Sequence, residues 1–69
     1  METEELKAKV EAVLFVTSRA MKPIEIAQIL DSKEEEVEQA LLDLMFDYSS
    51  RQGALEIDDE DGYIIQVRA

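Results

Sequence analysis

Apolar residues recur at helical spacing through the first part of the chain. This pattern predicts a helix from Glu4 to about Ser18, with Thr3 as its N-cap because a threonine hydroxyl can accept a hydrogen bond from the first helical turn. The side of this helix that faces a core is predicted to consist of Leu6, Val10, Val13 and Leu14.

A proline marks the start of a second helix. The residue before a proline avoids the helical conformation, so residues 19–22 are expected to form a short extended connection. Pro23 suits the first helical position, where its missing amide hydrogen would be unpaired in any case. The buried stripe of this short helix is predicted to be Ile26, Ile29 and Leu30.

A capping signal introduces a third helix. Ser32 and Glu35 have the spacing of a capping box, in which each side chain accepts a hydrogen bond from the backbone amide of the other residue. The helix is predicted from Lys33 to about Ser50, which leaves only Asp31 and Ser32 in the preceding turn. Two amphipathic helices joined so closely form a helix-turn-helix pattern. The core-facing side of the third helix is predicted to consist of Val37, Leu41, Leu44, Met45 and Tyr48.

Beyond Gly53 the apolar period changes from helical to alternating. Leu55 and Ile57 lie on either side of Glu56, and the same two-residue spacing returns in Tyr63, Ile65 and Val67. The acidic segment 58–62 between them ends in Asp-Gly, which favours a hairpin turn. Three helices followed by a β-hairpin predict an α+β fold of the winged helix-turn-helix type, as a single domain over residues 1–69.

Charge is distributed unevenly along this pattern. The 69 residues hold 17 acidic and 7 basic groups, for a net charge of -10. Residues 1–22 are neutral, whereas residues 23–50 carry -7 and residues 51–69 carry -3. The excess therefore falls mainly on the third helix and the wing, with which a winged helix would contact DNA. Direct DNA binding by this domain alone is not expected, because these carboxylates would repel the phosphate backbone.

Composition also argues against catalysis, metals and membranes. Without histidine or cysteine, the usual zinc ligands are missing and no hydroxyl has a histidine to activate it. The acidic turn does not fit a calcium loop, because Ile57 and Arg68 occupy its first and twelfth positions. We expect no enzyme activity, no metal and no cofactor. The longest apolar run, residues 12–16, is too short to span a membrane, so a cytoplasmic location is expected.

A second apolar stripe runs along the first and third helices. In the first helix, Ala8, Ala12 and Phe15 lie roughly opposite the core-facing side, with Val16 at one edge. The third helix repeats the pattern with Leu42 and Phe46. These residues either complete the core from two sides or pack under the hairpin, or they form a surface for another protein. If they form a surface for another protein, its anchors are Phe15 and Phe46, with Gln39 as a hydrogen-bonding residue at the rim. The predicted protein-contact residues are Ala12, Phe15, Gln39, Leu42 and Phe46.

The chain also resembles a known family along nearly its whole length. The runs EAVLFV from Glu11, KPIEIAQIL from Lys22 and EVEQAL from Glu36 are similar, in order and spacing, to segregation and condensation protein B, ScpB. LMFDY from Leu44, GALEI from Gly53 and the hairpin run from Asp61 to Arg68 continue the resemblance. Residues 18–20, Ser-Arg-Ala, lack the glycine common in the first loop of that family.

The resemblance implies a winged helix that binds proteins in place of DNA. In the ScpB family the N-terminal winged helix is associated with homodimer formation, and a second one contributes to binding the kleisin ScpA. With the SMC ATPase these proteins form a condensin-like complex for chromosome condensation and segregation. The second winged helix is expected to be absent from this chain, which stops after the hairpin. Two alternatives remain: a small transcriptional regulator that binds DNA, or an acidic adaptor module that binds a basic protein.

Overall fold

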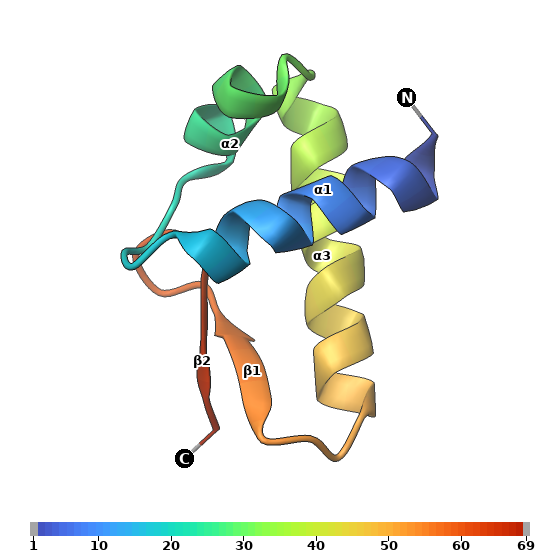
Figure 1. Cartoon of the computed structure of the whole chain (residues 1–69). Helices are drawn as coiled ribbons and strands as arrows, with labels where there is room; N and C mark the ends of the chain where they lie inside the picture. The colour runs from blue at the N-terminus through green and yellow to red at the C-terminus, as the bar shows by residue number, and fades with distance from the viewer. Residues whose placement is uncertain (1, 69) are drawn as a thin grey trace.

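The computed structural model describes residues 2–68 and has three helices followed by two strands. Figure 1 shows α1 crossing α3, with α2 beside the start of α3 and the hairpin beside its C-terminal half. The strands are antiparallel, with Leu55 opposite Val67 and Ile57 opposite Ile65. The predicted order of three helices and a hairpin is confirmed. The elements are α1 (Thr3–Val16), α2 (Pro23–Leu30), α3 (Glu34–Ser50), β1 (Leu55–Asp58) and β2 (Ile64–Val67).

The core is built around α3, because α1, α2 and β1 all pack against this helix. Helical periodicity identified its main contributors correctly. The four core-facing residues predicted in α1 are buried, and of the five predicted in α3 only Met45 is partly exposed. Each fully buried aliphatic side chain stabilises the fold by roughly 1.5–3 kcal/mol relative to an exposed one. The fully buried large side chains are Val10, Leu14, Ile26, Val37 and Leu41.

Two apolar residues of the predicted patterns are exposed. In α2, Ile26 and Ala27 are buried and Leu30 packs against the core, whereas Ile29 lies outside this arc and is largely exposed. That part of the prediction was wrong because an eight-residue helix buries only a narrow stripe. Val67 is also largely exposed, because it pairs with Leu55 at the end of the hairpin, where only Leu55 packs against the core.

The predicted caps of α1 and α3 were wrong. Thr3 is already helical, and Glu2 occupies the N-cap position without a side-chain hydrogen bond. The predicted capping box of Ser32 and Glu35 does not form, because α3 begins at Glu34 and Lys33 is its N-cap. Ser32 instead helps to end α2: its amide donates to Ala27 O over 2.9 Å, and Asp31 adopts the left-handed conformation. The turn between α2 and α3 therefore has three residues, 31–33.

The extended connection between α1 and α2 joins the hairpin. The amide of Met21 donates to Tyr63 O over 2.9 Å, and the amide of Tyr63 donates to Met21 O over 2.7 Å. Met21 is buried, although the sequence pattern did not identify it as a core residue. Gly62 makes this approach possible, because it has φ = 94° and a Cβ there would lie 3.2 Å from Ala20 Cβ and from Met21 backbone atoms.

We therefore expect Gly62→Ala to destabilise the fold. The left-handed φ and the close contact with Met21 should together lower the free energy of unfolding by about 1–3 kcal/mol. Urea unfolding followed by circular dichroism measures this change. Gly53→Ala is the matched control, because a Cβ on Gly53 meets nothing within 4 Å. Equal stability of the two variants would contradict the role assigned to Gly62.

Candidate protein-contact faces

One candidate face lies on the side of α3 that points away from the core. Gln39, Leu42 and Phe46 are spaced by three and four residues, which places them on one side of the helix. Leu42 is 54% exposed and Phe46 is 70% exposed, so neither side chain completes the core. Gln39 is exposed and its Nε2 donates to Asp43 Oδ1 over 3.1 Å. We call Gln39, Leu42 and Phe46 the α3 face.

A second candidate face lies on α1. Phe15 is 58% exposed, and Ala8, Ala12 and Val16 beside it are exposed as well. Phe15 also lines an open hollow of about 270 Å³, whose other walls include Tyr48 and residues 53–55 at the start of the hairpin. We call Ala8, Ala12, Phe15 and Val16 the α1 face.

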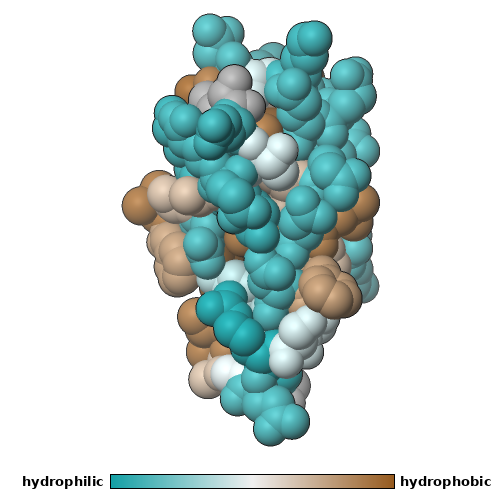
Figure 2. Space-filling model, turned by 90° about the vertical axis from the view of Figure 1, so that its right-hand side faces the viewer, coloured by the Kyte–Doolittle hydropathy of each residue, from teal (hydrophilic) through white to brown (hydrophobic). Residues whose placement is uncertain are grey.

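The structure does not bring the five predicted contact residues into one site. The buried sides of α1 and α3 pack against each other, so their outer sides point in different directions. Figure 2 shows the result: apolar side chains gather toward both edges of the view, and a hydrophilic band separates them. A single flat partner surface could not cover Phe15 and Phe46 together.

The two faces have different electrostatic surroundings. The charges of residues 2–22 cancel, and Lys9 lies 3.8 Å from Glu5 beside the α1 face. In contrast, α3 contains six carboxylates and no basic residue. Within residues 2–68, the only one of these six with an ion-pair partner is Asp47, which lies 2.7 Å from Lys7 Nζ. The α3 face is therefore apolar at its centre and acidic at its borders.

Tyr48 connects α1, α3 and the hairpin through hydrogen bonds beneath these faces. Its hydroxyl donates to Glu11 Oε2 over 2.5 Å, and the guanidinium of Arg51 lies 4.5 Å from the centroid of its ring. Arg68 donates to Tyr48 O over 2.9 Å and to Leu55 O over 3.3 Å. Helical periodicity had predicted Tyr48 as buried but gave no signal for its partners, because Glu11 and Arg68 are distant in sequence.

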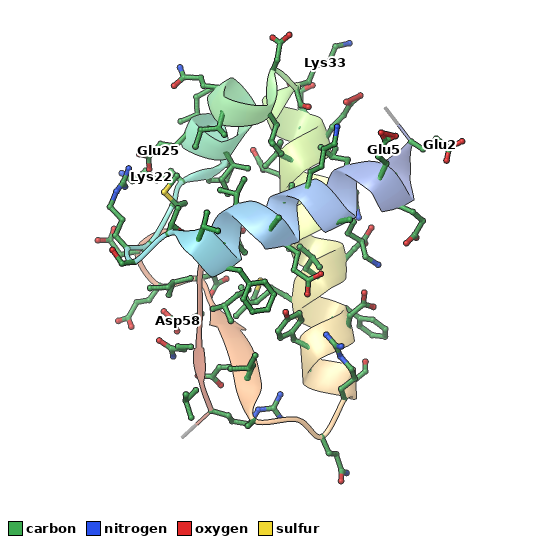
Figure 3. All side chains as sticks on the ribbon, viewed as in Figure 1. Glu2, Glu5, Lys22, Glu25, Lys33 and Asp58 are labelled. Carbon is green, nitrogen blue, oxygen red and sulfur yellow. The ribbon has the colours of Figure 1, made fainter. Side chains whose placement is uncertain are left out.

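The loop between α1 and α2 is held by an exposed charge cluster. Arg19 Nη2 lies 2.8 Å from Glu25 Oε2, and the amide of Lys22 donates to Glu25 Oε1 over 3.0 Å. The labelled Glu25 and Lys22 lie together at the start of α2, away from Glu2 and Glu5 at the other end of α1 (Figure 3). The Arg19 hydrogen bond, followed by the Lys22 amide, lowers the pKa of Glu25 to about 2. This cluster fixes where α2 begins.

Burial, and then the hydrogen bond to Glu11, raise the pKa of Tyr48 to about 12. Because the folded protein holds this proton more tightly than the unfolded chain, the contribution of Tyr48 to stability is complete below about pH 10 and is lost toward about pH 12. We expect Tyr48→Phe to be about 1–2 kcal/mol less stable at neutral pH. Its free energy of unfolding should then fall less than that of the parent protein between these two pH values.

Urea unfolding across this pH range measures the difference. The pKa of Tyr63 is also raised by burial, but Tyr63 is present in both proteins and cancels in the comparison. Parallel stability curves through alkaline pH would show that the Tyr48 hydroxyl does not titrate in this way.

Residues 2–68 contain no group of three or more carboxylate, histidine or cysteine side chains placed to hold a metal ion. No helix in the described part of the chain is long and apolar enough to cross a membrane.

The fold is that of a winged helix with an acidic third helix and two exposed apolar faces. Comparison with known proteins supports this class of fold and identifies the family. The chain belongs to the family of the segregation and condensation complex subunit ScpB, whose family model matches residues 8–69. The resemblance noted in the sequence is therefore confirmed.

A solved structure supports the same fold. The crystal structure of ScpB from Mycobacterium tuberculosis matches with a TM-score of 0.92 and 20% sequence identity, over 100% of this chain and 44% of that chain. The protein thus spans less than half the length of that structure. A comparison with curated proteins gives no match.

Proposed function

We propose that this protein is a non-enzymatic interaction domain of a cytoplasmic, condensin-like SMC–kleisin complex in chromosome condensation and segregation. Its contribution there is homodimerisation through the α1 face. ScpA and the SMC ATPase are the partners that family membership suggests. The observation that carries the proposal is an exposed aromatic anchor, Phe15, in the charge-balanced segment 2–22 of an otherwise acidic domain.

The charge pattern favours the α1 face over the α3 face for self-association. In a two-fold symmetric dimer the same patch of each copy meets its counterpart, so like charges on a patch oppose one another. The balanced charges around α1 avoid this cost, whereas two α3 helices would bring unpaired carboxylates together. Small Ala8 and Ala12 beside Phe15 also allow two helices to approach closely.

We expect a homodimer at micromolar concentrations, measured by light scattering over a dilution series. Phe15→Ser should weaken the dimer at least about tenfold, because exposed aromatic anchors dominate contact energies. Added salt should strengthen the dimer, because it screens the repulsion between two chains that each carry a net charge of -10.

Phe46→Ser is the matched control for this experiment, since it removes an equally large exposed aromatic side chain from α3. It should leave the dimer unchanged. A protein that stays monomeric at every concentration, or a dimer that only Phe46→Ser disrupts, would overturn the proposed interface.

DNA binding by a small regulator is the second candidate function, favoured by the helix-turn-helix topology alone. In such proteins the N-terminal part of the recognition helix contacts base edges. In α3 this part carries Glu34, Glu35 and Glu36, all exposed. A gel shift at low salt, where electrostatic binding is strongest, tests this candidate. We expect no shift, and a salt-sensitive shift would establish DNA binding instead.

A further inference from the structure

The α3 face continues into a hollow that could receive a side chain from another molecule. An open space of about 460 Å³ lies between α3 and the hairpin, and Phe46 forms part of its wall. Met45 and Ile57 provide apolar surface, while Arg68 and Glu56 lie at its polar side. The guanidinium of Arg68 is already engaged by two backbone carbonyls, so the hollow is mainly an apolar recess beside an exposed aromatic ring.

Carboxylates border this apolar surface on several sides. Glu35 lies one turn before Gln39 on the same side of the helix, and Glu38 and Asp43 flank it. No basic side chain forms an ion pair with these three residues in the described part of the chain. The face is therefore complementary to a surface that is apolar along its centre and basic along its edges.

We propose that the α3 face binds an amphipathic helix of a different protein, with an apolar stripe flanked by lysine or arginine. The stripe packs on Leu42 and Phe46, one apolar side chain enters the hollow, and the basic groups lie against Glu35, Glu38 and Asp43. A helix suits this site because side chains spaced by three and four residues can match the ridge on α3. The proposal does not depend on homodimerisation, since the α1 face points elsewhere.

Charge and apolar surface together distinguish this occupant from the others. A second copy would oppose its own acidic α3 helix to these carboxylates and gain no neutralising charge. Nucleic acid is repelled by the same groups. A purely basic segment would leave Leu42 and Phe46 exposed, so it would gain electrostatic attraction without burying the apolar centre.

The test uses the whole protein and a fluorescent synthetic peptide of roughly 18 residues, or about five helical turns. The peptide has leucines at three- and four-residue spacing and lysine or arginine on both flanks. Fluorescence anisotropy should show saturable one-to-one binding that weakens with added salt. A peptide of the same leucine pattern with glutamate flanks should not bind.

Two matched pairs of variants locate the site. Phe46→Ser should weaken peptide binding at least about tenfold, whereas Phe15→Ser should leave it unchanged. The double variant Glu35→Gln and Glu38→Gln should weaken binding and reduce its salt dependence. Asp59→Asn with Asp61→Asn removes the same number of charges from the hairpin tip and should have a much smaller effect.

All these side chains are exposed, so each variant should retain the helical circular dichroism of the parent. Equal affinity of Phe46→Ser and the parent, or equal effects of the two charge-removing pairs, would show only general attraction to an acidic protein and overturn the proposal. Loss of the homodimer in Phe46→Ser would assign the face to a second copy instead. If Phe15→Ser abolishes the dimer and Phe46→Ser abolishes peptide binding, both proposals stand independently.

Discussion

The packing of one side of α3 is the constraint on which the rest of the structure depends. Val37, Leu41 and Leu44 face inward, and α1, α2 and β1 are arranged around them. These three elements cover only one side of the helix. The same geometry that makes the core therefore leaves Leu42 and Phe46 exposed. The candidate α3 face exists because this helix has apolar residues on both sides and the other elements cover only one of them.

Helical and alternating periodicity predicted the fold well, because burial in so small a domain is mostly decided by side-chain spacing. These periodic patterns gave wrong or missing predictions where backbone hydrogen bonds, and not side-chain spacing, decide the structure. Ser32 has the right spacing to cap α3, but its amide is used by the C-terminal motif that ends α2. Met21 gave no periodic signal, since its burial comes from a two-bond bridge to Tyr63 across more than forty residues. Such a contact depends on the tertiary fold and has no local signature.

The predicted protein-contact residues show a second limit of what the sequence pattern can predict. Spacing alone placed Ala12 and Phe15 on one outer stripe and Leu42 and Phe46 on another, and the structure leaves these side chains exposed. What spacing could not show is the relative direction of the two stripes, because that is set by how α1 crosses α3. The crossing separates them into two faces. It also places the hydroxyl of Tyr48 against Glu11, which links the helices through a polar contact that no pattern in the sequence indicated.

Separation of the two faces has a consequence for assembly. A partner on α1 and a partner on α3 do not compete for the same surface, so both can be bound at once. Their electrostatics also respond oppositely to salt: screening removes repulsion between two acidic copies but weakens attraction between α3 and a basic helix. Tyr48 contributes to the walls of both hollows, one beside Phe15 and one beside Phe46. This side chain therefore lies beside both surfaces, and any energetic coupling between the two bound partners would by linkage act equally in both directions.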